Sequence, residues 1–442
     1  MTDRGFWSWT AAAVGVGIVA RLTYILTAAR GRIELFGDAE TYHLLGRHLA
    51  GGAGYVRPRE YAELGVSVPT AEFPPLYPAV LAMADFVGIN NADDQRFLGC
   101  LVGGASIVVM ALLGRAIAGP LVGVIAAGIV AVYPQMIVFD GSLASEGWYF
   151  LFVTATLWCV YEARRNDAHA LRWLGAGGAV VGLAVLTRSE AILLLPALLV
   201  PAAFVRTGDD GIDWRAWGRR VGVAAIGVIV CLGAWTVRNA ISLDHVQPFT
   251  NNSGTLLAGA NCERTYRGEQ AGLWRIDCAL AVDVEGLDET DAAAERRSAA
   301  IEFAVDNPER LPAVGALRVL RTAGVWDVRT QLFYESLEGR DYHWLWAGWI
   351  GWIIAAPAAI AGVVLARRQR IAVWPLVVPV ALVFALVVFT YGNQRFRVGA
   401  EPSVIVLAAL TAATVARRLR LSPNPAGRSR AHDQEQEPAG SS

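Results

Sequence analysis

Apolar stretches long enough to cross a lipid bilayer recur along most of the chain, and this feature constrains the fold more than any other. A bilayer core about 30 Å thick needs about 20 mostly apolar residues per helix. The composition agrees, because 55% of the 442 residues are hydrophobic and only 17% are charged, against about 25% charged residues in a typical soluble domain. The pattern predicts an all-α polytopic membrane protein and argues against an ordinary cytosolic enzyme.

We expect about ten transmembrane helices, with boundaries uncertain by a few residues. They cover residues 6–28, 97–114, 120–139, 147–163, 173–187, 190–205, 219–236, 345–366, 371–391 and 398–416. The apolar stretch that begins at Pro74 is short, and counting it as a span would invert every later loop. We therefore expect it to form a helix that lies on the outer surface.

The distribution of arginine predicts the orientation of the chain, because short cytoplasmic loops are enriched in basic residues. Placing the N-terminus inside puts most loop arginines on the cytoplasmic side and also places the C-terminus there. Four regions follow. They are an N-terminal transmembrane module (1–237) with an outer loop (29–96), an extracytoplasmic cap (238–344), C-terminal transmembrane helices (345–416), and a polar cytoplasmic tail (417–442) that we expect to be disordered.

The charges of the chain exclude several function classes. The net charge is −1, so nothing suggests a nucleic-acid partner. All 38 basic residues are arginine, which excludes Schiff-base chemistry on lysine and a Walker-type phosphate lysine. No CxxC or Cys/His set indicates a metal site.

Five cysteines divide by location: Cys100, Cys159 and Cys231 lie in predicted spans, where they behave as small apolar residues. Cys262 and Cys278 lie in the outer segment 238–344. Oxidising conditions outside the cytoplasm permit a disulfide between them, which would close a loop of about 15 residues. Two unpaired thiols are the less favoured alternative.

The stretch GDAETYHLLGRHLAGGAGY, from Gly37, is the first place where chemistry could lie. If a helix begins at Asp38, then Asp38 and Tyr42 fall on one face and Glu40 and His43 on the other, as expected of a helix in the membrane interface. Asp38 could then meet a substrate presented at the lipid surface. Its spacing alone favours a simpler role, because aspartate is a preferred N-cap residue.

A second group is DGSLASEGWY, a short outer turn that carries Asp140 and Glu146. No basic residue in the turn neutralises these carboxylates, which could bind a cation, position an acceptor or support a base. Helix capping by Ser145 and Glu146 is an equal alternative.

The third group consists of arginines near the outer ends of the predicted spans. Most of the other arginines lie on the predicted cytoplasmic side, so this group is an exception. Guanidinium is the preferred protein partner of phosphate. The group predicts a phosphate clamp made of Arg21, Arg188, Arg238, Arg395 and Arg397. For any single member, snorkelling or a local ion pair, such as Arg188 with Glu190, is the alternative. Carboxylates and arginines at one face suit transfer of a group from a lipid phosphate to an acceptor outside the cytoplasm.

Several motifs in order resemble the bacterial polyprenyl-phosphate-sugar-dependent glycosyltransferases of the GT-C fold. The class includes protein O-mannosyltransferases and aminoarabinose transferases. The motifs are the Asp38 segment with its GxGY end, PPLYP, LASEGWYF, GLAVLTRSEAILLLP, WTVRN ahead of NNSGTLLAGAN, and QRFRVGAEPSVIVLAA. The resemblance runs from about residue 15 to residue 416.

The resemblance implies roles for the three groups of residues. Asp38 occupies the position of the catalytic base that acts on the acceptor hydroxyl. Asp140 and Glu146 look like the second acidic loop of the family. Some branches of the family use this loop to hold a divalent cation, and others are metal-free. Glu40 is a further candidate on the acceptor side. The arginines fall where contacts to the donor phosphate are expected.

Two departures leave the acceptor open. Protein O-mannosyltransferases carry adjacent acidic residues, whereas Ala39 separates Asp38 from Glu40 here. Aminoarabinose transferases present a lysine near the proline pair, whereas Glu72 precedes FPPLYP here.

The expected function is an inverting hexosyl or pentosyl transfer from a polyprenyl-phosphate-linked sugar to a glycan, lipid or protein hydroxyl. The expected location is the bacterial plasma membrane, with the active site on the extracytoplasmic side. The alternatives are a transporter or flippase for lipid-linked saccharides, which performs no chemistry, and a glycan ligase or polymerase. A transporter is less favoured, because no inverted repeat is evident and the charges gather at one face.

Overall fold

The computed structural model describes residues 1–31, 35–207 and 211–421. Nearly all regular structure in these residues is helical. The long or apolar helical segments are α1 (Asp3–Tyr24) with η1 (Ile25–Ala29), α6 (Leu98–Ala118), α7 (Pro120–Val132), α8 (Pro134–Gly141), α9 (Glu146–Arg165), α10 (Ala170–Val185), η3 (Ser189–Leu193), η4 (Leu195–Leu199), α11 (Val200–Ala202), α12 (Trp214–Ser242), α19 (Tyr342–Arg368), α20 (Trp374–Phe389) and α21 (Glu401–Leu421).

Shorter elements fill the connections. They are α2 (Asp38–Ala50), α3 (Pro58–Leu64), α4 (Leu76–Phe86), α5 (Ala92–Gln95), η2 (Asp167–His169), the antiparallel pair β1 (Arg206–Thr207) and β2 (Gly211–Ile212), α13 (Ser253–Ala260), α14 (Glu263–Tyr266), η5 (Gly268–Gln270), α15 (Ile276–Leu280), α16 (Glu289–Asp306), η6 (Pro308–Arg310), α17 (Leu311–Thr322), α18 (Val328–Leu337) and η7 (Gln394–Gly399).

Every predicted span coincides with helical structure, and the chain is a multi-pass membrane protein. Six helices of the described residues are long and apolar enough to cross a membrane, or seven if α7 and α8, which meet at 56°, form one bent span. The segment Ser189–Ala202 and α20 are apolar but shorter, and α9 carries charged residues at both ends. Helix length and composition therefore do not establish the predicted count of ten.

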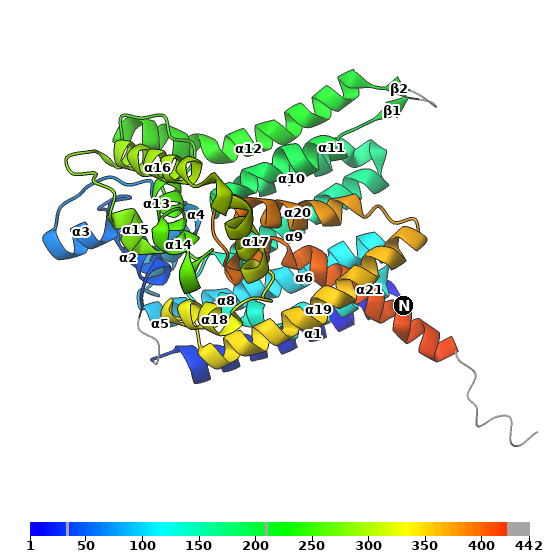
Figure 1. Ribbon diagram of the computed structural model, residues 1–442. Helices are drawn as coiled ribbons and strands as arrows, with labels where there is room; N and C mark the ends of the chain where they lie inside the picture. Colours follow the sequence, from blue (N-terminus) through cyan, green and yellow to red (C-terminus); the bar gives the residue numbers. More distant parts are fainter. Residues whose placement is uncertain (32–34, 208–210, 422–442) are drawn as a thin grey trace, which may run out of the picture.

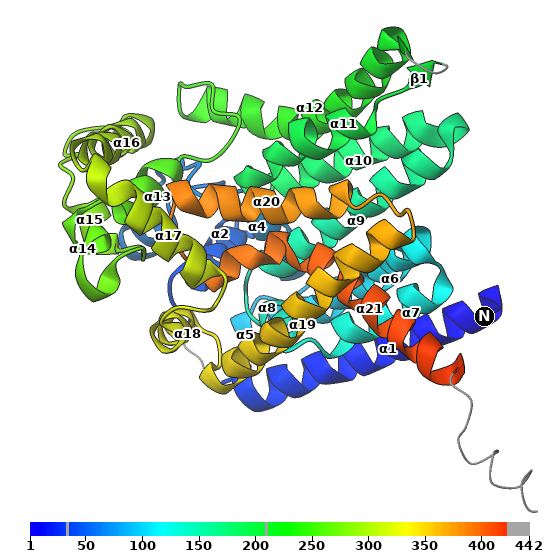
Figure 2. The ribbon, with the colours of Figure 1, turned by 45° about the vertical axis from the view of Figure 1, so that its right-hand side comes forward.

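The helices form one bundle along the long axis of the molecule (Figures 1 and 2). The apolar helices run side by side, and the N-terminus lies at the end opposite to the cap. Helices α2 to α4 and α13 to α16 gather at the other end. The two predicted outer segments therefore share one face of the molecule, which agrees with the assignment of both to the same side of the membrane.

The predicted surface helix is α2, and it packs against α4 rather than lying alone. Gly46 allows this close approach, because a Cβ atom there would lie 2.7 Å from the Cβ atom of Leu81. The rings of Tyr42 and Tyr77 make an edge contact at 5.0 Å. His43, expected on the opposite face, is also buried and its Nδ1 atom lies 2.8 Å from Gln95 Oε1. Both faces of α2 are therefore packed.

The cap is tied to the turn that precedes η7. The backbone N–H of Gly392 donates to the carbonyl of Gly272 at 2.8 Å. Gln331 Nε2 donates to the carbonyl of Gly392 at 3.2 Å, and the N–H of Asn393 donates to Thr322 Oγ1 at 3.2 Å. These bonds fix the position of the residues that follow, Arg395 among them.

A disulfide joins Cys262 and Cys278 within the cap, with their Cα atoms 6.1 Å apart. Helix α12 continues past residue 237, the predicted end of the N-terminal module, to Ser242. The last helix, α21, continues to Leu421. Residues 422–442 of the predicted tail lie outside the described residues.

Candidate active site

Asp38 is the first residue of α2, but it does not cap the helix. The N-cap position belongs to Gly37, which has a φ of 62° and no side chain to donate or accept. The Asp38 carboxylate instead accepts a hydrogen bond at Oδ2 from Nη2 of Arg395. The side chain of Asp38 keeps 33% of its surface exposed, so a substrate can reach it.

Arg395 is the centre of the site, because three carboxylates bind its guanidinium group. Nη2 donates to Asp38, Nε donates to Glu146 Oε1, and Nη1 donates to Glu338 Oε2 at 2.7 Å. Only 8% of the Arg395 side chain is exposed. A buried guanidinium with every edge paired is held in one orientation.

Glu146 opens α9 and joins Arg395 to Arg188. Arg188 Nη1 donates to Glu146 Oε1 at 3.2 Å, and Arg188 Nε donates to Glu190 Oε1 at 2.7 Å. Arg188 therefore forms the expected local ion pair with Glu190. It also shares Glu146 with Arg395. Ser145 makes no side-chain capping bond to α9, so capping does not account for this turn.

Three further residues of this site were not predicted, and they come from the segment ESLEGRDY. Arg340 Nη1 donates to Glu335 and, at 3.1 Å, to Glu338 Oε2. Arg340 Nη2 lies 3.9 Å from Glu146 Oε1. Arg340 precedes a span on its outer side, so the sidedness argument that selected the other arginines could have found it.

We call these residues the Arg395 cluster. Its members are Asp38, Glu146, Arg188, Glu190, Glu335, Glu338, Arg340 and Arg395. They comprise five carboxylates and three guanidinium groups, which leaves an excess of two negative charges when all are ionised. The five carboxylates come from four regions of the chain that are distant in sequence.

The other three predicted arginines do not join this cluster. Arg21 is fully buried, and its Nε donates to Asp140 Oδ2 at 2.7 Å. Gly103 makes room for this pair, since a Cβ atom there would lie 1.9 Å from Arg21 Nε. The five arginines do not converge at one place, because Asp140 of α8 pairs with Arg21 of α1 away from the Arg395 cluster.

Arg238 and Arg397 are also held elsewhere. Arg238 donates to the backbone carbonyls of Thr70, at 2.7 Å, and Tyr55. Arg397 lies 4.4 Å over the ring of Trp352, and its Nη2 donates to Gln394 Oε1 at 3.1 Å. These contacts brace the first outer loop and η7.

Glu40 lies outside the Arg395 cluster and forms an exposed pair with Arg59 at 2.7 Å. Exposed pairs of this kind contribute little to stability.

The predicted acidic pair does not fit a divalent cation. Asp140 is neutralised by Arg21, and Glu146 by Arg188 and Arg395. A cation would have to displace these guanidinium groups from both carboxylates.

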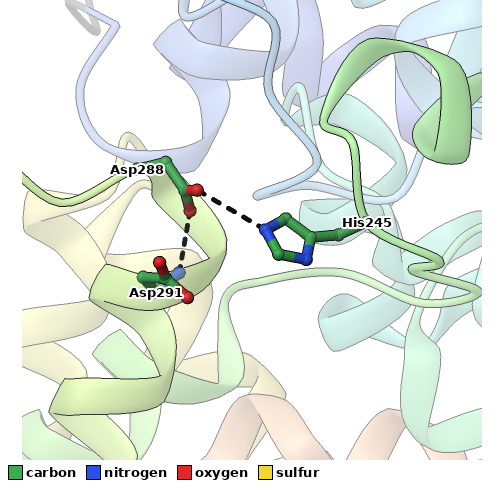
Figure 3. A group of neighbouring side chains, drawn as sticks. All are labelled: His245, Asp288 and Asp291. Atoms are coloured by element: carbon green, nitrogen blue, oxygen red, sulfur yellow. Dashed lines mark hydrogen bonds and ion pairs between the residues drawn. The ribbon is translucent and has the colours of Figure 1, made fainter.

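Another group with suitable ligand atoms, drawn in Figure 3, consists of the exposed residues His245, Asp288 and Asp291. Asp288 is the N-cap of α16, and its Oδ1 accepts from the backbone N–H groups of Thr290 and Asp291. These backbone bonds lower the pKa of the Asp288 carboxyl. Helix capping therefore explains this group without a metal.

Glu72, just before the proline pair, is an unusual carboxylate. Burial raises its pKa to about 7, and the negative charge of Glu289 adds to the shift. Glu289 itself accepts from the backbone N–H of Ala71 at 2.7 Å, which holds the two acids near each other. Glu72 is therefore a candidate for proton exchange near neutral pH.

A small, open pocket lies beside the cluster. Tyr149 and Glu190 line it, and Arg188 contacts both, through the face of the tyrosine ring and the carboxylate. The remaining walls are apolar and come from η3, α20 and neighbouring residues. They include Leu193, Leu194, Pro379, Leu382, Val383 and Leu386.

A layer of membrane helices, topped at one end by an outer-loop helix and a helical cap, is the GT-C fold. The chain has the fold of membrane glycosyltransferases of this type. Residues 72–235 match the dolichyl-phosphate-mannose-protein mannosyltransferase family, which is less than half of the chain. No curated protein sequence matches the chain.

Solved structures of an archaeal enzyme share this fold. The oligosaccharyltransferase of Archaeoglobus fulgidus, tethered with an acceptor peptide, superposes with a TM-score of 0.56 at 14% identity, over 95% of this chain and 50% of that protein. The same enzyme with an inhibitory peptide and a dolichol-phosphate gives 0.50 at 14% identity, over 98% and 53%. ArnT from Cupriavidus metallidurans, bound to undecaprenyl phosphate, gives 0.44 at 16% identity, over 94% and 79%. The chain spans about half the length of the archaeal enzyme.

Proposed function

We propose that this protein transfers a sugar from a polyprenyl-phosphate-linked donor to a hydroxyl group of an acceptor outside the cytoplasm. The observation that carries the proposal is the contact of Asp38 with Arg395. It puts a reachable carboxylate, which can take a proton, beside a guanidinium that can hold the departing phosphate. The dolichol-phosphate and acceptor peptide bound to the archaeal enzyme are consistent with such substrates.

The transfer takes place in one displacement. Asp38 accepts the proton of the acceptor hydroxyl as the oxygen attacks the anomeric carbon of the sugar. The bond from that carbon to the phosphate oxygen breaks, and the polyprenyl phosphate leaves with the electron pair. The attack comes from the face opposite to the phosphate, so the anomeric configuration inverts.

Arg395 and Arg188 stabilise the charge that develops on the phosphate. Both are already oriented by Glu146 before substrate binds, and such preorganised charges lower the barrier most effectively. The apolar pocket next to Arg188 suits the first isoprene units of the lipid.

The location that we propose is the bacterial plasma membrane, with the Arg395 cluster on the extracytoplasmic side. Activated nucleotide sugars are absent there, so a donor carried by a lipid suits the topology. The cap covers the same end of the molecule and would contribute to recognition of the acceptor.

A transfer assay tests the proposal. The purified protein in lipid nanodiscs is incubated with polyprenyl-phosphate mannose labelled in the sugar, with a bacterial envelope extract as the source of acceptor. We expect the label to leave the lipid in the wild type and to stay on it in the Asp38→Asn variant. Label that stays on intact lipid for a protein that binds the donor would support a transporter and contradict the proposal.

A further inference from the structure

Glu338 makes a contact that resembles the binding of a phosphate. A single oxygen, Oε2, accepts from Nη1 of Arg395 at 2.7 Å and from Nη1 of Arg340 at 3.1 Å. Two guanidinium groups that converge on one anionic oxygen form the arrangement in which arginines bind a phosphate oxygen. The position between Arg340 and Arg395 is therefore suited to a phosphate monoester and is filled by a side chain of the protein itself.

Both guanidinium groups at this position already carry carboxylates. Each terminal contact of Arg395 goes to a carboxylate, and the cluster already has two more carboxylates than guanidinium groups. Adding a phosphate to this excess of negative charge is unfavourable. A carboxylate must leave Arg395 before a phosphate can bind.

Glu338 is the carboxylate best able to leave. Glu146 is fully buried, so it has no route into solvent. Asp38 lies in the first turn of α2, where the positive end of the helix dipole stabilises it. Glu338 follows the last residue of α18, keeps 31% of its side-chain surface exposed, and precedes Gly339, whose φ of 83° places it in the left-handed region.

The guanidinium group of Arg340 retains unused binding capacity. Its side chain is 2% exposed, and its Nε atom has no hydrogen-bond partner among the described residues. A buried guanidinium N–H without a partner is costly. A phosphate offers more acceptor oxygens than one carboxylate, so it can replace the bridge made by Glu338.

We infer that Glu338 is a placeholder for the phosphate of the donor: it bridges Arg340 and Arg395 in the free protein and is displaced when a polyprenyl phosphate binds. This inference rests on the proposed function. It assigns Arg340 to the donor site and makes Glu338 a positioning residue, which keeps both guanidinium groups together until the donor arrives. The lipid form is favoured over free phosphate by the apolar pocket beside Arg188.

The affinity of the Glu338→Gln variant for undecaprenyl phosphate in nanodiscs tests the inference. Glutamine keeps the size of the side chain but competes less strongly for the arginines, so we expect binding about tenfold tighter than in the wild type. Glu335→Gln is the matched control, because it removes a charge beside Arg340, five residues away in the sequence, from a carboxylate that does not contact Arg395. We expect a much smaller change for this control.

Two further ligands identify what displaces Glu338. Undecaprenol has the lipid tail without the phosphate, and its affinity should not change between the wild type and Glu338→Gln. Inorganic phosphate should bind far more weakly than the lipid. Equal gains for undecaprenol, or free phosphate that binds as tightly as undecaprenyl phosphate, would overturn the inference.

The remaining outcomes separate this inference from the proposed function. If the wild type binds undecaprenyl phosphate and Glu338→Gln binds it equally well, or no better than Glu335→Gln, the placeholder is wrong and the donor class stands. If no form of the protein binds the lipid phosphate, both fail. A structure with bound undecaprenyl phosphate gives an independent check, in which Glu338 must no longer contact Arg395.

Discussion

The carboxylate of Asp38 accepts a hydrogen bond from the guanidinium group of Arg395, a residue 357 positions later in the chain. The pair unites the first outer loop with the turn that precedes the last helix. It also brings the acid that was expected to act as a base into contact with the cation that was expected to bind phosphate. The consequences of this arrangement can be measured.

Asp38→Asn should abolish transfer while leaving the protein folded. Asparagine fills the same space and still accepts from Arg395, but it cannot take up the proton of an acceptor. We expect the transfer rate to fall by about 10²–10⁴-fold. Binding of undecaprenyl phosphate serves as the control and should persist. Transfer at the wild-type rate would remove Asp38 from the mechanism.

Glu146→Gln should destabilise the protein. The change leaves Arg188 and Arg395 without a carboxylate that is fully buried between them, and breaking such a buried pair costs about 3 kcal/mol. Thermal unfolding in detergent micelles should show a Tm several degrees below that of the wild type.

Glu40→Gln is the matched control for Glu146→Gln, because Glu40 pairs with Arg59 at the surface. Its effect on stability should stay below about 1 kcal/mol. Equal Tm values for the two variants would mean that Glu146 does not carry the stability that its burial indicates.

Loss of the disulfide should weaken the cap. Cys262 and Cys278 are 16 residues apart, and closing a loop of this length contributes about 3 kcal/mol in the chain-entropy model. The Cys262→Ser/Cys278→Ser variant should therefore be cleaved faster within the cap by a protease. Cys100→Ser removes a free thiol and controls for the substitution itself. Cleavage at the same rate in all forms would argue against a stabilising role.

Glu72 should make stability depend on pH. Its folded pKa of about 7 exceeds the ordinary value of 4.5, so the folded state binds more protons than the unfolded state between these values. Stability should therefore fall as pH rises through this window and then level off.

Glu72→Gln removes that dependence. Relative to the wild type, the free energy of unfolding of this variant should rise by about 1–2 kcal/mol at about pH 8 and by almost nothing at about pH 4. The gain is smaller than the full pKa shift would give, because the side chain is partly exposed to solvent. Tm values of both proteins across this range provide the measurement. A difference that is the same at both ends would show that the carboxyl of Glu72 does not titrate in the predicted window.

The positions of the apolar helices could be predicted from the sequence, because a helix that crosses a bilayer needs about 20 mostly apolar residues in a row. A run of apolar residues marks each helical segment whatever it packs against, and α2 begins at Asp38 as expected. The number of helices that cross the membrane is harder to predict. The bend between α7 and α8 and the short segment Ser189–Ala202 depend on neighbouring helices rather than on local hydropathy.

The site could be predicted in part. Glu146, Arg188 and Arg395 each lie at one end of an apolar run, and Asp38 lies in the loop after the first run; those positions are visible in the sequence. The partners of Arg21 and Arg238 are not visible there, because a carboxylate 119 residues away satisfies the first and backbone carbonyls satisfy the second. Sequence position can show that an arginine is out of place, but it does not identify the group that neutralises it.

The bonds from the cap to Gly392 and Asn393 have a consequence for biosynthesis. Asp38 and Glu146 are synthesised 357 and 249 residues before Arg395, and hydrogen bonds from the cap hold the turn that presents Arg395. A growing chain therefore carries the acids of its reaction centre without their principal counter-ion. The Arg395 cluster is therefore complete only after residue 395 has been synthesised and the cap has folded against the turn before η7.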